Sequence, residues 1–258
     1  MVDSIRHRLL HQIGVGAFSK FCKASDEWGH ALVAKVHAPE MEASLWQNEV
    51  RQLRRFAGPG VVYLHRVFAH DGHCYLVLDD AGVPVSRCRF DTPEQRLKAA
   101  VLVAKGVLPA LALLHVVGRC HGDINPQNVL LKLDGQNRLP GASLVDFGLC
   151  RSQAYLDAGS AAMARWTPPP EYCLNQALNG SALDIWHLGL LLLQVIKGET
   201  LDYSEVDILS EKPLQDAQAL GLPIGRALSA ALDCNPAQRP NALDLWRYIR
   251  AALNNAST

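Results

Sequence analysis

The pattern of apolar residues changes near Val83, and this change constrains the fold more than any other feature of the sequence. Before it, the apolar runs are short and bounded by Gly, Asp and His, as at residues 31–36 and 74–78, which predicts strands. One helix is expected over residues 40–56, where apolar residues recur at helical spacing. Beyond Val83 helical patterns dominate. Strands followed by helices indicate an α+β fold with two segregated lobes.

The same change predicts how the 258 residues are organised. We expect a single domain over residues 1–258. Its small, β-rich N-terminal lobe with one helix would span about 1–80, and its larger, mainly helical C-terminal lobe about 85–258. The connection between the lobes would lie at about 79–84.

Composition excludes several classes of protein. Hydrophobic residues make up 49% of the chain and charged residues 19%, which excludes intrinsic disorder. The 25 Lys and Arg residues balance the 25 Asp and Glu residues. No general basic field would therefore attract nucleic acid, and no nucleic-acid partner is expected.

Neither membrane insertion nor export by a signal peptide is expected. The longest apolar runs, about 108–117 and 188–196, are shorter than the ~18–20 residues of a membrane helix, and Gly106 and Pro109 should kink the first helix. The N-terminal residues contain no signal-peptide core. The seven cysteines are scattered without a CxxC pair, which indicates free thiols in the cytoplasm or another reducing compartment. Delivery into another cell as an effector is compatible with these features.

Two early motifs carry groups that need partners. In IGVGAFSKFCKA, Gly14 and Gly16 let a backbone approach a ligand closely, although glycine pairs also mark ordinary turns. Lys35 lies within an apolar strand, and Glu49 lies on the apolar face of the predicted helix. The two charges could satisfy each other across one interface, or both could be solvated.

Two later motifs carry hard oxygen ligands. HGDINPQNVLL places Asp123 and Asn128 five positions apart before an apolar run, and LVDFGLC places Asp146 after another. Such oxygens suit proton acceptance and a magnesium–phosphate site. Either motif alone could be an ordinary turn, but their occurrence together and in this order favours a site.

With these motifs the sequence resembles the eukaryotic-type protein kinase family over nearly its whole length. The family's ordered signature is a glycine-rich loop, a strand lysine, a helix glutamate, HRD…N, DFG and APE. The matching segments here are GVGAFS, VAKV, Glu49, HGDINPQN, DFG and PPE, followed by LDIWHLG and CNPAQRP. The resemblance implies a bilobal kinase fold, in which Arg239 pairs with Glu171. The residue usage further suggests a bacterial, eukaryotic-like kinase.

The resemblance also implies roles for individual residues. Asp123, Lys35 and Asn125 would be catalytic, and Asn128 and Asp146 would bind Mg²⁺. Asp123 would accept the proton of the acceptor hydroxyl or orient that hydroxyl. Leu78 would stand at the gatekeeper position, and residues 79–81 would form the adenine-binding hinge. The full set expected to bind ATP is Gly14, Gly16, Ser19, Phe21, Ala34, Lys35, Glu49, Leu78, Asp79, Ala81 and Leu130. Leu53, His121 and Phe147 resemble members of a hydrophobic spine.

Five positions depart from the family pattern. Ser19 replaces the third loop glycine, and Phe21 replaces the valine that roofs the adenine, which predicts a tight or reshaped pocket. Gly122 replaces the HRD arginine that receives an activation-loop phosphate, so no such phosphate should be required. Asn125 and Ala164 replace a lysine and a threonine on the substrate side.

Three functions follow from this comparison. The leading one is an ATP- and Mg²⁺-dependent kinase that phosphorylates an unidentified protein, on Ser/Thr rather than Tyr. The first alternative is a small-molecule phosphotransferase, because HGDINPQN also resembles the HGDxxPxN loops of aminoglycoside and choline kinases. The second is a pseudokinase scaffold, which the changes at Phe21, Asn125 and Ala164 favour.

Overall fold

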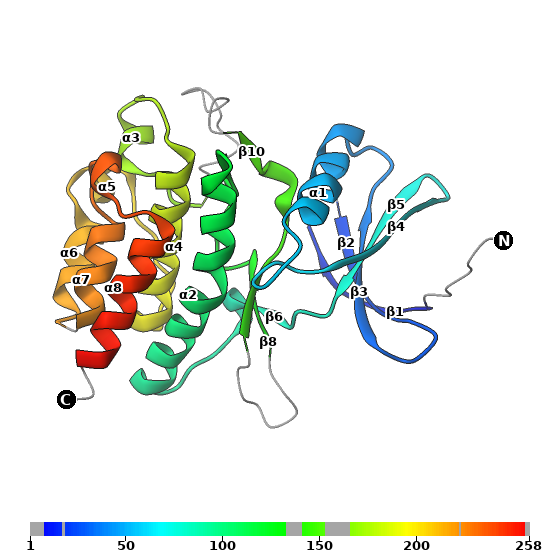
Figure 1. Cartoon of the computed structure of the whole chain (residues 1–258), viewed down its shortest axis with the longest axis horizontal. Helices are drawn as coiled ribbons and strands as arrows, with labels where there is room; N and C mark the ends of the chain where they lie inside the picture. The colour runs from blue at the N-terminus through cyan, green and yellow to red at the C-terminus, as the bar shows by residue number, and fades with distance from the viewer. Residues whose placement is uncertain (1–7, 17–18, 133–140, 153–165, 222, 256–258) are drawn as a thin grey trace.

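The protein has two lobes, one built on a sheet and one mainly helical, as the computed structural model shows (Figure 1). The structure describes residues 8–16, 19–132, 141–152, 166–221 and 223–255. The N-terminal strands lie at one end of the molecule and the last helices at the other. The predicted α+β class is confirmed.

The N-terminal lobe is a five-stranded antiparallel sheet with the order β1-β2-β3-β5-β4. Its elements are β1 (Arg8–Val15), β2 (Ser19–Ser25), β3 (Ala31–His37), α1 (Ala43–Arg55), β4 (Leu64–His70) and β5 (His73–Asp79). The strands expected at 31–36 and 74–78 and the helix expected at 40–56 are all confirmed. Helix α1 lies beside the sheet (Figure 1) and buries Glu49, Val50, Gln52 and Leu53.

Two segments join the lobes. After β5 the chain enters the short strand β6 (Val83–Pro84), which pairs with β8 (Val129–Lys132). Gly82 permits this crossing, because its φ is +101° and a side chain there would collide with the Leu131 carbonyl oxygen. Before β4, residues 60–62 run along β9 (Gly141–Leu144), where the Val62 N–H donates to the Leu144 carbonyl at 3.0 Å.

The C-terminal lobe is built around α2 (Pro93–Val116), which contacts α4, α8 and β9. The other helices are α3 (Pro170–Cys173), α4 (Gly180–Lys197), α5 (Glu205–Leu209), α6 (Lys212–Ala219), α7 (Pro223–Ala231) and α8 (Ala242–Asn255). The short elements among its described residues are η1 (Val85–Arg87), β7 (Arg119–Cys120), η2 (Phe147–Leu149), β10 (Arg151–Ser152) and η5 (Pro236–Gln238). This lobe supplies the loops that face the sheet.

Helix α2 runs without interruption through Gly106 and Pro109. Gly106 serves packing, because a side chain there would collide with the Ala142 carbonyl oxygen of β9. By length and composition α2 is also long and apolar enough to cross a membrane, which the short apolar runs did not predict. Its inner face, including Val103 and Val107, is fully buried in the protein core.

Candidate active site

An ion network centred on Lys35 joins the two lobes. The Lys35 Nζ lies 2.8 and 2.9 Å from the two carboxylate oxygens of Glu49 on α1 and 3.0 Å from the Asp146 Oδ1. The predicted Lys35–Glu49 pair is therefore present, with only 5% and 1% of the side chains exposed. Burial alone would lower the pKa of Lys35, but the charges of Glu49 and Asp146 outweigh it and raise that pKa. Lys35 stays an ammonium ion.

Asp146 is held at the mouth of this network by an unusual backbone conformation. It follows β9 with φ +63° and ψ +73°, the left-handed region that aspartate tolerates better than most residues. Its carboxylate is partly exposed and accepts a hydrogen bond from the Gly148 N–H at 3.4 Å. Burial would raise the pKa of Asp146, but the Lys35 ammonium holds it below its ordinary value. Asp146 therefore presents a negative charge to the site.

Asn48 also fixes this segment, and the sequence prediction missed it. Its Nδ2 donates to the carbonyl oxygens of Gly148 at 3.0 Å and Cys150 at 2.9 Å. Its Oδ1 accepts from the Nε2 of buried Gln52, one turn along α1, at 3.0 Å. Two amides on the inner side of a predicted amphipathic helix were the available signal, because buried polar groups need partners.

The loop after β7 presents Asp123 between two amide side chains. The Asn125 Nδ2 donates to the Asp123 Oδ1 at 2.9 Å, and the Asn128 Nδ2 donates to its Oδ2 at 2.6 Å. The Asn125 Oδ1 accepts from the backbone N–H groups of Gln127 and Asn128 at 2.8 and 3.1 Å. Asn125 therefore orients Asp123 and braces the loop, but it adds no positive charge.

Asp184 on α4 anchors the backbone of this loop. Its carboxylate accepts the backbone N–H groups of His121 and Gly122, both at 2.8 Å, and lies 2.9 Å from the His115 Nε2. Burial would raise the pKa of Asp184, but the hydrogen bond and charge of His115 outweigh it and lower that pKa. Gly122 has φ +79°, so a glycine suits this position for a conformational reason that the sequence comparison did not supply.

The predicted spine residues are all in the core. Leu53, His121 and Phe147 are fully buried or nearly so, and the His121 and Phe147 rings meet edge to face with centroids 4.9 Å apart. The His121 ring also lies 3.1 Å from the Val145 carbonyl oxygen through Nε2. The Val145 N–H also donates to the Asn128 carbonyl at 3.0 Å. Through these contacts Asp146, the next residue in the chain, lies beside the loop that carries Asp123.

The glycine-containing turn covers a phenylalanine. The Gly16 N–H donates to the Ser19 carbonyl at 2.7 Å. The Phe21 ring lies under Gly14 and Gly16, since a side-chain carbon on either glycine would meet ring carbons at 3.7–3.8 Å. The ring centroid is 5.9 Å from the Lys35 Nζ. Phe21 therefore occupies space between the turn and the lysine, as expected of a reshaped pocket.

One predicted binding residue points away from the site. Side chains alternate along a strand, and Ala34 packs on the opposite face of β3 from Lys35, in a cluster with Leu32, Val36 and Val77. The prediction that Ala34 lines the nucleotide site is therefore wrong. Val33 shares the face of Lys35 and pairs across strands with Leu78, and the alternation alone would have identified it.

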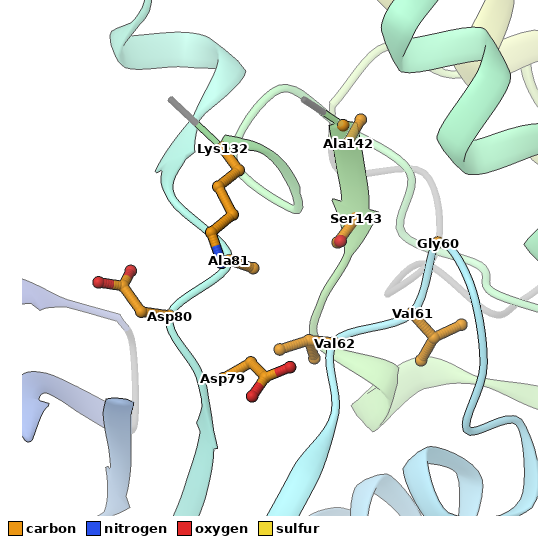
Figure 2. Close-up of a pocket in the computed structure, with 10 residues that line it drawn as sticks. Gly60, Val61, Val62, Asp79, Asp80, Ala81, Lys132, Ala142 and Ser143 are labelled. Carbon is orange, nitrogen blue, oxygen red and sulfur yellow. The ribbon is translucent and has the colours of Figure 1, made fainter. Parts of the chain in front are cut away.

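The predicted hinge borders a hollow that does not include the ion network. The side chains of Asp79 and Asp80 are paired with His65 at 2.6 Å and Lys23 at 2.5 Å. Figure 2 shows the residues around the hollow beside them, which has a volume of about 300 Å³. It is lined by Gly60, Val61, Val62, Asp79, Asp80, Ala81, Lys132, Gly141, Ala142 and Ser143. Leu130, on β8, is half-buried and does not line this hollow.

A buried ion pair stabilises the C-terminal lobe away from these charges. The Arg239 Nη1 and Nη2 donate to the two Glu171 carboxylate oxygens at 2.8 and 2.7 Å. The guanidinium also lies over the Trp186 ring, 4.9 Å from its centroid. The predicted pairing of Arg239 with Glu171 is present.

Ala164, which was paired with Asn125 as a departure on the substrate side, lies outside the described residues.

The residues around Asp146 have the donors that a magnesium ion requires. Mg²⁺ prefers hard oxygen ligands, usually one or two carboxylates. In the described residues the Asp146 Oδ2 and the Asn128 Oδ1 accept no hydrogen bond, although other atoms of both side chains are bonded. The predicted metal ligands thus fit the ion. No cluster of three or more His, Cys, Asp or Glu residues suited to a metal occurs in the described part of the chain.

Comparison with known proteins agrees with this arrangement. Residues 7–244 match the family model of the protein kinase domain. Similar proteins include calcium/calmodulin-dependent protein kinase type 1B of Homo sapiens, 32% identical over 80% of this chain, and CBL-interacting protein kinase 4 of Oryza sativa subsp. japonica, 31% identical over 91%. Serine/threonine-protein kinase PAK mbt of Drosophila melanogaster is 27% identical over 92%. The matched regions span 60%, 55% and 38% of these relatives' own lengths.

Proposed function

The chain belongs to the protein kinase domain family, and from this premise we propose that it transfers the γ-phosphate of Mg-ATP to a Ser or Thr hydroxyl of a protein. The observation that carries the proposal is the Lys35–Glu49–Asp146 network, which lies beside the loop of Asp123 and Asn128. A buried ammonium held by two carboxylates is preorganised to bind phosphate, and phosphoryl transfer depends mainly on positioning and charge neutralisation.

Each described residue of the site has its own role in phosphoryl transfer. Lys35 holds a phosphate oxygen and is fixed by Glu49 on α1. Asn128 and Asp146 would hold Mg²⁺, which would neutralise negative charge on the phosphates. Asp123 orients the acceptor hydroxyl and receives its proton, and its carboxylate is aligned by the Asn125 and Asn128 amides.

Asn125 makes this enzyme slower than relatives with a lysine at that position. Its amide orients Asp123 but cannot offset charge on the transferred phosphate. Loss of one charge-assisted contact costs about 1.5–3 kcal/mol, which corresponds to roughly a ten- to hundredfold lower rate. The similar Drosophila melanogaster protein is a serine/threonine-protein kinase, which supports a Ser/Thr acceptor for this chain.

Activity does not require a phosphate on the activation loop. Gly122 supplies no cation to receive one, and its φ of +79° suits glycine. Treatment of the purified protein with a phosphatase, followed by removal of the phosphatase, should leave the transfer rate unchanged. A loss of most activity after this treatment, reversed by preincubation with ATP, would contradict this part of the proposal.

The test of the main proposal is transfer of labelled γ-phosphate from Mg-ATP to a protein mixture, with the labelled residue identified. We expect label on Ser or Thr, and none with Asp146→Asn. Asp202→Asn is the matched control, because Asp202 is exposed and away from the network. Label on an aminoglycoside or choline but not on protein would assign a small-molecule phosphotransferase. Binding of ATP without any transfer would indicate a scaffold.

A further inference from the structure

A buried histidine lies between the glycine-containing turn and helix α1. His37 is the last residue of β3 and is fully buried. Its Nδ1 lies 2.9 Å from the Ser19 Oγ, at the start of β2. Its Nε2 lies 3.4 Å from the Glu49 Oε2 and makes no hydrogen bond of good geometry within the described residues. The ring thus bridges two elements that the proposed function uses.

The register of the sheet explains this position. Ser19 is the direct cross-strand partner of His37, so their side chains lie on the same face. Lys35 is two residues earlier on β3 and shares that face, because side chains alternate along a strand. Glu49 therefore meets two groups of β3, Lys35 at 2.8 Å and His37 at 3.4 Å.

The Glu49 carboxylate favours one tautomer of the His37 ring, and the Ser19 hydroxyl can adapt to it because a hydroxyl either donates or accepts. A neutral imidazole has one N–H and one bare nitrogen. If Nδ1 accepts from the Ser19 O–H, Nε2 carries the hydrogen and faces the Glu49 carboxylate at 3.4 Å, a favourable charge–dipole contact that lacks hydrogen-bond geometry. If Nδ1 carried the only hydrogen, the bare Nε2 would face the carboxylate, and the two would repel. The carboxylate thus favours the tautomer in which the Ser19 O–H donates to Nδ1, so the two contacts of the ring are linked.

Other groups near the ring do not replace this link. Cys74 on β5 is the second cross-strand partner of His37. It is buried and carries only a weak S–H donor. Lys35 is already bound to both Glu49 oxygens and to Asp146. Within the described residues, Ser19 is the hydroxyl that contacts the His37 ring.

We propose that His37 is a positioning residue that couples the Ser19 turn to helix α1 through Glu49. Because Glu49 fixes Lys35, the link makes the start of β2 and the phosphate-binding lysine move as one unit. The role of this link in nucleotide binding rests on the proposed function. Breaking it loosens a preorganised site, so the cost falls on nucleotide affinity.

The test is a double-mutant cycle on the dissociation constant of a non-hydrolysable Mg-ATP analogue. Ser19→Ala removes one end of the link. His37→Gln retains a donor toward Glu49 but lacks the group that contacts Ser19. We expect each variant to weaken binding about two- to tenfold, and the double variant to bind no more weakly than the worse single one. Ser25→Ala, at the other end of β2, should bind as the wild type does, because Ser25 makes no side-chain hydrogen bond in the described residues.

Multiplicative effects of the two substitutions, or a Ser19→Ala variant with unchanged affinity, would overturn the proposal. The nitrogen shifts of ¹⁵N-labelled histidine give a second readout, because Ser19→Ala should move both ring nitrogens of His37, and unchanged shifts would also overturn it. The outcomes separate the two proposals. If the two substitutions are coupled in a protein that binds the analogue but transfers no phosphate, the link is supported and the proposed function is contradicted. If their effects multiply in an enzyme that does transfer phosphate, the link is contradicted and the proposed function is supported.

Discussion

Removal of the Glu171 carboxylate should strongly destabilise the C-terminal lobe. Glu171 and Arg239 form a two-bond pair, at 2.8 and 2.7 Å, whose side chains are 1% and 0% exposed. In Glu171→Ala the guanidinium would retain the carbonyl oxygens of Asp233 at 2.8 Å and Ala182 at 3.1 Å. Those neutral acceptors do not compensate a buried positive charge.

The expected loss follows from that uncompensated charge. Breaking a buried ion pair by removing one partner costs about 3–5 kcal/mol. For a chain of this size each kcal/mol lowers the melting temperature by about 2–4 °C, so Glu171→Ala should melt roughly 6–20 °C below the wild type. Arg247→Ala is the control, because the Arg247–Asp244 pair is exposed, with 74% and 36% of the side chains accessible. It should cost about 0.2–1 kcal/mol.

The assay is thermal and guanidinium unfolding followed by circular dichroism. A second variant, Glu171→Leu with Arg239→Met, separates the charge from the packing. If the buried charge is the cause, removing both partners should cost less than Glu171→Ala alone. A Glu171→Ala variant that melts within 1–2 °C of the wild type, or a double variant less stable than the single one, would refute the reasoning.

Three further predictions test individual contacts. A Gly→Ala change inside a helix ordinarily stabilises it by about 0.5–1 kcal/mol. Gly106→Ala in α2 should instead lower the free energy of unfolding by about 1–3 kcal/mol, because the methyl group meets the Ala142 carbonyl oxygen; a higher stability in urea would contradict this. Phe21→Val should lower the KM for ATP by roughly two- to tenfold, because it removes the ring from beneath the turn, and a higher KM would show that the ring supports the nucleotide. Asp184 has a lowered pKa, so its contribution is present above its unfolded pKa near 4 and is lost as the pH falls through the folded value. The stability difference between wild type and Asp184→Asn should therefore shrink below about pH 4, and an equal difference at pH 3 and pH 7 would disprove that linkage.

Residue patterning predicted the parts of this protein that depend on local sequence. Hydrophobic periodicity placed β3, β5 and α1 within a few residues of their observed bounds. The Lys35–Glu49 pair was also predictable, because a charge on an apolar strand and one on an apolar helix face both require partners. These are properties that one strand or one helix carries by itself.

Features that depend on the approach of two backbones were not predictable. Gly106 was expected only to kink α2, but its lack of a side chain also lets α2 approach the Ala142 carbonyl oxygen of β9. Gly122 was interpreted only as the loss of an arginine, whereas in the structure it has φ +79° and donates its N–H to the Asp184 carboxylate. His37 attracted no functional prediction, because its importance comes from cross-strand register with Ser19. Ala34 was predicted to line the nucleotide site because that prediction ignored the alternation of side chains along β3.

The distribution of charge explains why these separate features belong to one site. Glu49 on α1, Asp146 after β9 and Asp123 in its loop carry three carboxylates, and Lys35 on β3 carries the one ammonium of the described network. The excess of negative charge would repel a nucleotide, which is itself an anion. A divalent cation held by the Asp146 and Asn128 side-chain oxygens would reverse that repulsion, because it offsets two negative charges where the phosphates must lie. The arrangement therefore favours nucleotide only together with a hard metal ion, and titration with the Mg-ATP analogue should give much tighter binding than titration with the analogue in EDTA.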